Sequence, residues 1–303
     1  MLRTGHQRPA FASVRAGPPQ TTTLEGEEAV PTVRMPLFQF HMLCDPGFAL
    51  GSGFSIDRFE FNDRWRLKIF SEQDVEHIRR ARWALNYEGD NIKGYKALSN
   101  LILMAFRMFS VKYPPFIRYR LCAEPGESTR INQSMTYNYA FPRERDPYSF
   151  EEMEQIRTAF GHLRTMDATS NRTHNAIYYL FRAFHADKWI DSFLLMTAAL
   201  ESLFSKDAPG GATEAIATRV ASLLGSTERC TKADVEQLYD LRSAMTHGRI
   251  VASDDPGENL AKLEHLEYVT NAAFRKLIET GKYTMFSTKA ERDAYMGTLN
   301  VAL

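Results

Sequence analysis

The sequence has little cysteine and no long apolar run. It holds only three cysteines, Cys44, Cys122 and Cys230, which lie far apart and form no Cys-x-x-Cys pair. An odd number of widely spaced cysteines argues against a disulfide framework and a zinc site, and it favours a reducing compartment. No stretch approaches the roughly 18 to 20 consecutive apolar residues that a membrane-spanning helix needs. We therefore expect a cytoplasmic protein with no membrane segment, no metal and no other cofactor.

An excess of charge of either sign is also missing. The chain has 37 Lys and Arg residues and 37 Asp and Glu residues, so its formal net charge is zero. No global positive field therefore attracts nucleic acid, and any contact with RNA must come from a local patch or from the groove of a dimer. The length of 303 residues suits two domains or one large domain.

Residues 1 to 34 have the composition of a disordered tail. Arg3, Arg8 and Arg15 are followed by proline, glycine and a threonine run, without hydrophobic periodicity. The arginines, with no acidic residue before Glu25, leave an organelle transit peptide as an alternative, although no amphipathic helical pattern supports it. Met35 is a second possible start of the protein.

Residues 35 to 145 predict a small α+β domain of unknown role. Short aromatic-rich runs, separated by glycine, proline and asparagine turns, indicate strands, and two longer apolar segments indicate helices. The expected strands cover 37–43, 55–61, 65–70, 116–122 and 131–139, and the expected helices cover 72–86 and 95–109.

Two features of this region invite a functional interpretation. Gly51-Ser-Gly53 is too short for a phosphate-binding loop and no helix follows it, so we interpret it as a turn. The basic stretch 77–83 is interpreted as a solvated helix face paired with nearby acidic residues. Contact between that face and RNA phosphates is the alternative.

Residues 149 to 282 predict an all-α bundle of five or six helices, which makes the chain mainly α. Ser149 and Glu152 fit a capping box at the start of the first helix. The helix expected at 187–204 is apolar around most of its circumference and should be central. The expected helices cover 150–166, 171–185, 187–204, 213–224, 232–247 and 258–280, and a C-terminal extension, 283–303, adds a short helix at 289–296.

The segment from Leu238 to Gly248 is the most informative part of the bundle. Leu238, Leu241 and Met245 are spaced at i, i+3 and i+7 and form one apolar stripe on a helix. Gly248 follows where a left-handed residue would end that helix.

Two polar residues of this segment, Arg242 and His247, suit metal-free RNA cleavage. Histidine exchanges a proton readily near neutral pH, and the charged fork of arginine matches a phosphate. Five residues of separation place the two side chains about 140° apart on an ideal helix. Convergence therefore requires the helix to end or distort at His247, or a second chain to complete the site. The alternative without chemistry is that both residues stabilise the helix end through its dipole.

Glu201 is the one charge among residues 192–204, and it lies on a narrow polar line with Thr197 and Ser205. An unpaired buried carboxylate is costly, so Glu201 needs a cationic partner. Arg242 is the first candidate and Arg219 the second. The structural interpretation is an ion pair that ties two helices together, and it is compatible with a role in holding Arg242 for a phosphate.

Three segments of the chain, in order, resemble ApeA-like HEPN domains. They are Ala198–Phe204, Ala217–Gly225 and Leu241–Gly248, and the similarity extends over roughly residues 150 to 280. The resemblance implies a HEPN-like helical bundle in which the motifs of two chains face each other across a homodimer. It also implies a metal-independent endoribonuclease that leaves 2′,3′-cyclic phosphate and 5′-OH ends.

The same resemblance implies roles for individual residues. His247 would act in proton transfer and Arg242 on the phosphate, with Glu201, Ser243 and Arg219 in support. It further implies bacterial defence against phage or a toxin-like stress response. The N-terminal domain would then act as a sensor or regulator, and an antitoxin or other regulator is a possible partner.

Ser243 departs from the pattern of HEPN ribonucleases that place Asn, Asp or His directly after the arginine. A serine can donate one hydrogen bond but is a weaker orienting group. It favours an alternative function, a catalytically inactive HEPN module that binds RNA or protein. A third interpretation is an unrelated helical scaffold in which Arg242 and His247 are structural.

Overall fold

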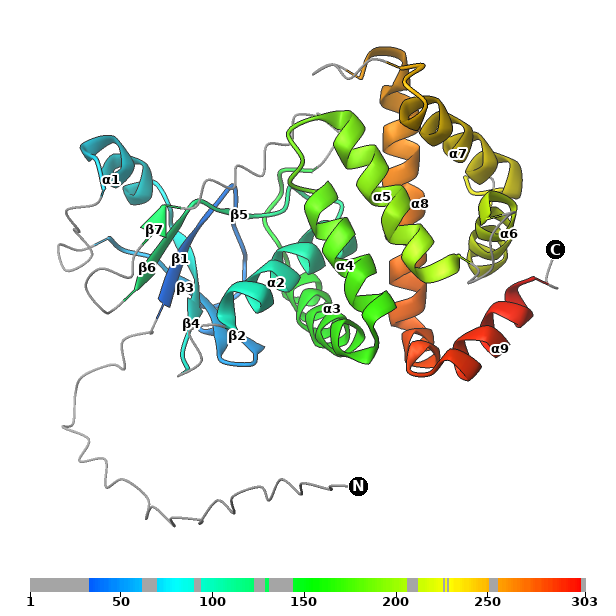
Figure 1. Cartoon of the computed structure of the whole chain (residues 1–303). Coiled ribbons are helices and arrows are strands. Elements are labelled where there is room, and N and C mark those ends of the chain that lie inside the picture. The colour runs from blue at the N-terminus through cyan, green and yellow to red at the C-terminus, as the bar shows by residue number, and fades with distance from the viewer. Residues whose placement is uncertain are drawn as a thin grey trace, which may run out of the picture. The chain divides into compact units, whose positions relative to one another are not determined.

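The computed structural model describes residues 33–61, 70–89, 94–122, 129–130, 144–205, 212–225, 227, 229–250 and 256–300. A sheet-containing N-terminal region precedes a helical C-terminal part, as the sequence predicted (Figure 1). The expected strand at 131–139, most of that at 65–70 and nearly all of the expected tail lie outside the described residues. Within the described residues, no helix is long and apolar enough to cross a membrane.

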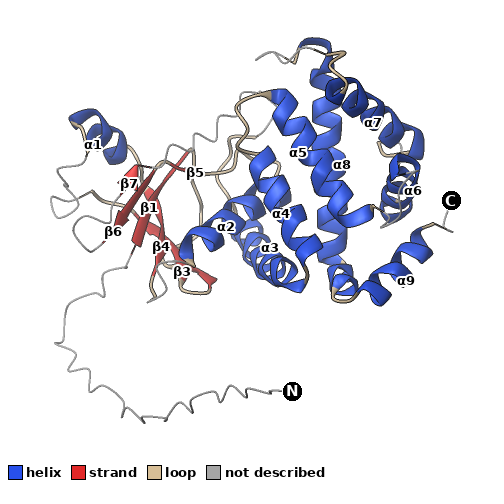
Figure 2. Cartoon of the chain, in the orientation of Figure 1, coloured by secondary structure: helices blue, strands red, loops and turns tan. Residues whose placement is uncertain are grey.

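The N-terminal region is built on a seven-stranded sheet, whose strands are red in Figure 2. Its strand order is β2-β3-β4-β1-β6-β7, β5 pairs with β1, and all the pairings are antiparallel. The strands are β1 (Val33–Phe38), β2 (Phe48–Gly51), β3 (Phe54–Arg58), β4 (Trp83–Tyr87), β5 (Phe116–Ile117), β6 (Tyr119–Cys122) and β7 (Thr129–Arg130).

Strand β1 lies earlier in the chain than expected. It begins at Val33, inside the expected tail, and ends at Phe38, so the strand predicted at 37–43 is mostly wrong. Gln39 has a φ of 55°, in the left-handed region that residues with a Cβ rarely adopt. The extended backbone of β1 therefore ends at Gln39.

The glycines at 51 and 53 make the turn of a hairpin, as the sequence indicated. Strands β2 and β3 pair on either side of it. All three turn residues have positive φ values, 92° at Gly51, 55° at Ser52 and 79° at Gly53. A Cβ at Gly53 would lie 2.4 Å from the carbonyl oxygen of Glu88, so the hairpin requires glycine there.

The helix expected over 72–86 is wrong beyond Arg79. Helix α1 spans Glu72–Arg79, and the chain then enters the central strand β4, Trp83–Tyr87, in which every residue is buried. A strand buried on both faces has a continuous apolar run instead of an alternating one, so periodicity does not separate it from a helix. The basic stretch 77–83 consequently runs from α1 into β4 and is not a single helical face.

Helix α2, Tyr95–Phe109, forms as predicted and packs on the sheet. The ring of Tyr95 stacks on Tyr87 of β4, with centroids 5.6 Å apart, and Phe106 meets Phe40 edge-on at 5.6 Å. One hydrophobic core runs from the sheet through α2 into the helices. The described residues belong to one compact unit, Pro31–Leu303, and the division at residues 145 to 149 stays a prediction.

The C-terminal part contains seven described α-helices. Ser149 caps the first with the expected capping box: Ser149 Oγ accepts from the Glu152 amide at 3.3 Å, and Glu152 Oε2 from the Ser149 amide at 2.7 Å. Helix α5 is central, because it contacts α4, α6, α7 and α8. The helices are α3 (Phe150–Thr169), α4 (Asn171–Ala183), α5 (Trp189–Phe204), α6 (Ala212–Leu224), α7 (Lys232–Thr246), α8 (Leu260–Glu279) and α9 (Lys289–Leu299).

A buried ion pair joins α2 to α8. Arg107 donates from Nε and Nη2 to the two carboxylate oxygens of Glu267, at 3.0 and 3.1 Å. The two side chains are 6% and 5% exposed. The guanidinium carbon of Arg107 also lies 4.1 Å from the ring centroid of Phe184, at the end of α4. The pair thus fixes three elements that are distant in sequence.

Glu267→Gln should destabilise the fold strongly, because it removes the carboxylate charge that faces the buried Arg107 guanidinium. We expect chemical denaturation to show a loss of about 3–5 kcal/mol in the free energy of unfolding. Glu76→Gln is the control: its partner Arg80 is 3.9 Å away, and both side chains are mostly exposed. That variant should lose less than about 1 kcal/mol. Equal losses in the two variants would contradict the role given to the buried pair.

Candidate active site

Arg242 and His247 occupy different positions relative to α7. Arg242 lies inside α7, whereas His247 is the residue at which the helix stops. Arg242 is half-buried and directed at α5, since it pairs with Glu201 there, and His247 is exposed. Both residues are described by the structure, and no hydrogen bond or ion pair joins their side chains.

Glu201 is held by Arg242, the first of its two candidate partners. Arg242 Nη2 lies 2.9 Å from Oε1 and 3.2 Å from Oε2 of Glu201, so a single nitrogen reaches both oxygens. The Arg242 side chain is 35% exposed, and no other described residue accepts a hydrogen bond from it. Its Nε and Nη1 groups are the donors through which Arg242 can bind a second anion.

The Glu201–Arg242 pair is partly withdrawn from water. Burial raises the pKa of Glu201 above its ordinary value, while the charge of Arg242 acts in the opposite direction. The guanidinium carbon of Arg242 lies 6.0 Å from the ring centroid of Tyr239, within reach of a cation–π contact. Arg242 therefore has two neighbours that limit its position, a carboxylate and an aromatic ring.

Tyr239 is a site residue that the sequence analysis missed. Burial raises the pKa of its hydroxyl well above the ordinary value, so it stays protonated and donates to the Thr197 carbonyl of α5 at 3.4 Å. Tyr239 precedes Arg242 by three residues, so both lie on one helical face. This i, i+3 spacing was the signal that could have found it.

The end of α7 confirms the cap predicted at Gly248. Gly248 has a φ of 69° and donates to the Met245 carbonyl at 3.1 Å, and Arg249 donates to the Ala244 carbonyl at 2.8 Å. These two bonds define a Schellman motif. The motif stops the helix at His247 and leaves its side chain on the surface.

Ser243 and Thr246 surround the same helix end. Ser243 is half-buried, and its carbonyl accepts from the His247 amide at 3.0 Å. Thr246 donates from its hydroxyl to the carbonyls of Arg242 and Ser243, at 3.1 Å each. The Ser243 hydroxyl makes no hydrogen bond with another described residue, so the structure does not give it an orienting contact to Arg242 or His247.

Arg219, the second candidate partner of Glu201, lies elsewhere. It is 5% exposed and donates from Nη1 to the Phe204 carbonyl at 2.5 Å, and from Nε to Asn300 Oδ1 at 3.2 Å. Burial lowers its pKa. Arg172 donates to the Ser202 carbonyl, 3.0 Å away. Both arginines thus satisfy carbonyls in the last turn of α5, one and three residues after Glu201.

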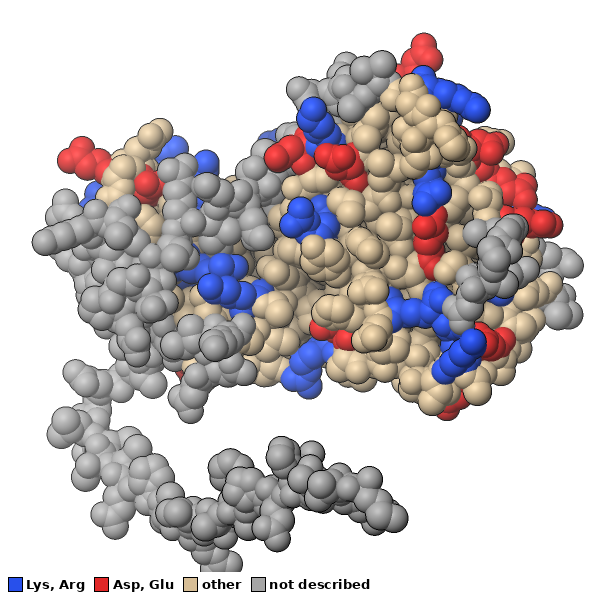
Figure 3. All heavy atoms as spheres, viewed as in Figure 1, with Lys and Arg blue, Asp and Glu red and all other residues tan. Residues whose placement is uncertain are grey.

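The site has no cluster of metal-ligating side chains. Across the described part of the chain, no group of three or more His, Cys, Asp or Glu residues is arranged to hold a metal ion. On the face shown in Figure 3, Lys and Arg alternate with Asp and Glu over the helices. Any phosphate bound near the end of α7 would therefore be held by individual cations, of which Arg242 and Arg249 belong to this stretch of the chain.

Gly248→Ala should lower stability, because a Cβ is strained at a φ of 69° even though no atom lies within 4 Å of it. We expect the free energy of unfolding to fall by about 1–2 kcal/mol. Gly161→Ala, inside α3, is the matched control: it also meets no atom within 4 Å, and its backbone is helical. That change should raise stability by about 0.5–1 kcal/mol. Denaturant titrations that give both variants the same sign would contradict the cap.

Comparisons of the chain with protein-family models, with curated proteins and with solved structures find no match. The resemblance to ApeA-like HEPN domains therefore rests on the three sequence segments alone. The geometry adds an arginine held by a half-buried carboxylate and, five residues later, an exposed histidine at a helix end.

Proposed function

We propose that the chain is a HEPN-type, metal-independent endoribonuclease that works as a homodimer. The observation that carries the proposal is the Glu201–Arg242 pair, in which one nitrogen of Arg242 engages the carboxylate and the other donors remain for a phosphate. The three segments that resemble HEPN domains support it, since Glu201 and Arg242 fall in the first and third of them.

The chemistry needs only an arginine and proton-transferring groups. The ribose 2′-oxygen attacks the adjacent phosphorus, the bond from phosphorus to the 5′-oxygen breaks, and a 2′,3′-cyclic phosphate and a 5′-OH result. Arg242 offsets the negative charge that grows on the phosphate oxygens. His247 moves a proton, either from the attacking 2′-hydroxyl or to the leaving 5′-oxygen.

Glu201 is a positioning residue in this scheme. Its two oxygens share one nitrogen of Arg242, which fixes the direction of the guanidinium without using all of its donors. The Tyr239 ring lies near the same guanidinium. A preorganised cation loses less conformational entropy when the phosphate binds than a freely rotating one. Ser243 is placed beside Arg242 in the chain but is not oriented by a described contact.

A dimer would bring Arg242 and His247 to the same phosphate, which one chain does not do. Arg242 is directed at α5 while His247 is exposed beyond the last turn, and no interaction joins them within the described chain. Two copies that face each other would place the His247 of one copy beside the phosphate held by Arg242 of the other. The net charge of zero also favours a groove formed by two copies over a single basic surface.

The biological setting follows from the resemblance. We propose a role in bacterial defence against phage or in a toxin-like stress response, with the sheet-containing region as a sensor or regulator. In such a role the cleavage activity would be held back by that region or by a partner such as an antitoxin.

A catalytically inactive HEPN module that binds RNA or protein is the second candidate. Ser243 favours it, because the hydroxyl makes no hydrogen bond to Arg242 or His247 that would orient the site. The exposed His247 would then contact a partner without transferring protons.

Cleavage of RNA in the presence of EDTA tests the first candidate. The wild type should cut a mixed RNA pool and leave cyclic-phosphate ends, and Arg242→Ala and His247→Ala should each be slower by at least about a hundredfold. His174→Ala is the control, because its exposed ring pairs only with Asp167 on the surface. Unchanged cleavage in Arg242→Ala and His247→Ala would refute the site. RNA binding without cleavage by a folded wild type would favour the inactive module.

Mixing the two inactive variants tests the dimer. If one site combines residues of both chains, subunit exchange between Arg242→Ala and His247→Ala yields heterodimers in which an intact Arg242 faces an intact His247. The mixture should then cleave RNA faster than either variant alone, and size-exclusion chromatography with light scattering should show a dimer. A mixture as inactive as its components, with exchange demonstrated, would place both residues of each site on the same chain.

A further inference from the structure

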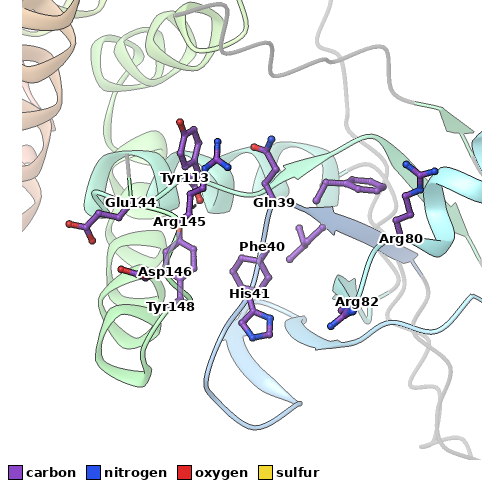
Figure 4. A pocket seen from close by; sticks show the side chains of 12 residues that line it. Gln39, Phe40, His41, Arg80, Arg82, Tyr113, Glu144, Arg145, Asp146 and Tyr148 are labelled. Carbon is purple, nitrogen blue, oxygen red and sulfur yellow. Dashed lines mark hydrogen bonds between the residues drawn. The ribbon is translucent and has the colours of Figure 1, made fainter. Parts of the chain in front are cut away.

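A concave site lies far along the chain from α5 and α7. It is a pocket of about 430 Å³ between the end of β1, the connection from α1 to β4, and the segment around Tyr148 (Figure 4). Its lining includes three arginines, Arg80, Arg82 and Arg145, together with aromatic rings. It shares no residue with the Arg242–His247 site, so we consider its ligand separately.

Backbone hydrogen bonds hold Arg80 and Arg82 in place on one side of the pocket. The carbonyl of Arg82 accepts from the Phe59 amide at 3.0 Å, and the amide of Arg80 donates to the His77 carbonyl at 3.1 Å. Their side chains are exposed, and Arg80 has only a loose contact, 3.9 Å, with Glu76. Arg82 forms no ion pair with another described residue. Figure 4 shows the two side chains leaving the backbone in different directions, so each guanidinium group is available separately to an anion at this side of the pocket.

The opposite side of the pocket is aromatic and also held in place. Tyr148 stacks on Phe40, with centroids 5.4 Å apart, and donates from its hydroxyl to the Tyr113 carbonyl at 3.0 Å. The Tyr148 amide donates to the His41 carbonyl at 2.8 Å, which ties this segment to the chain that leaves β1. The guanidinium carbon of Arg145 lies 5.6 Å from the ring centroid of Tyr113.

The charge inside the pocket is positive although two acids contribute to its lining. Figure 4 shows the carboxylates of Glu144 and Asp146 directed away from the end of β1, whereas Arg145 lies beside Tyr113, next to Gln39. Gln39 is exposed at the left-handed residue that ends β1, and its amide can both donate and accept hydrogen bonds. The pocket thus contains arginine guanidinium groups, aromatic rings and the side-chain amide of Gln39.

We propose that this pocket binds a single nucleotide. Its phosphate would pair with Arg80 or with Arg82, because arginine forks match phosphate oxygens. Its base would lie against Tyr113 and Arg145, where stacking tolerates any base, and its edge would reach the Gln39 amide. The volume falls within the range of pockets for small ligands, about 300–1,000 Å³.

A single nucleotide fits the observations better than a length of RNA. An RNA strand crossing the rim would bring its phosphates past the outward-facing carboxylates of Glu144 and Asp146, which repel them. The phosphate of a nucleotide that ends inside the pocket lies near the arginines and not near these carboxylates. The proposal does not depend on RNA cleavage at Arg242 and His247.

Equilibrium binding to the full chain tests the proposal, with ATP, GTP, AMP, adenosine, inorganic phosphate and a short single-stranded RNA as probes. At least one nucleotide should bind at micromolar concentration and more tightly than adenosine or inorganic phosphate, with weaker binding at high salt. The double variant Arg80→Ala/Arg82→Ala should weaken that binding by at least about tenfold, as expected for lost charged hydrogen bonds. Arg79→Ala, at the last residue of α1 and outside the pocket lining, should bind as the wild type does.

Three results would overturn the proposal. The first is no binding of any nucleotide to a wild type whose thermal unfolding is cooperative. The second is inorganic phosphate binding as tightly as the nucleotides, which would make the pocket a simple anion site. The third is RNA binding lost in the double variant while nucleotides do not bind, which would make the pocket part of an RNA surface. Because the double variant alters exposed side chains, its thermal unfolding should match that of Arg79→Ala.

Discussion

The buried ion pair between Arg107 and Glu267 is the constraint on which the arrangement of the described elements depends. It fixes α2, which packs on the sheet, to α8, which packs against the central helix α5. Helix α5 in turn carries Glu201, whose carboxylate directs Arg242. A buried pair of this kind contributes mainly to the uniqueness of the packing, because desolvation offsets much of its attraction. The position of the proposed catalytic arginine therefore follows from a contact made between distant parts of the chain.

The partial burial of the Glu201–Arg242 pair balances a fixed geometry against access for a phosphate. Burial disfavours the charged form of Glu201, and the charge of Arg242 favours it. A fully buried pair would hold Arg242 more tightly but would leave no donor for a phosphate. At 29% and 35% exposure, the two side chains keep a fixed geometry and an open side. The Schellman cap completes the arrangement by stopping α7 where His247 reaches the surface.

Local signals in the sequence were enough for the helix ends and for the main pair. The capping box at Ser149, the left-handed glycine at position 248 and the cost of burying Glu201 alone each led to a contact found in the structure. Periodicity failed at Trp83–Tyr87, because a strand buried on both faces lacks alternation. The Arg107–Glu267 pair and the Arg219–Asn300 contact were beyond reach, since they join residues 160 and 81 positions apart and depend on tertiary packing.

The central claim is that Arg242 and His247 promote attack by the ribose 2′-hydroxyl on the neighbouring phosphate. The most direct test compares an RNA strand that the protein cuts with the same strand carrying a single 2′-deoxy nucleotide at the cut position, both in EDTA. We expect the deoxy strand to resist cleavage at that position, because the nucleophile is missing, while the RNA strand ends in a 2′,3′-cyclic phosphate. Cleavage of the deoxy strand at the same bond would contradict the claim.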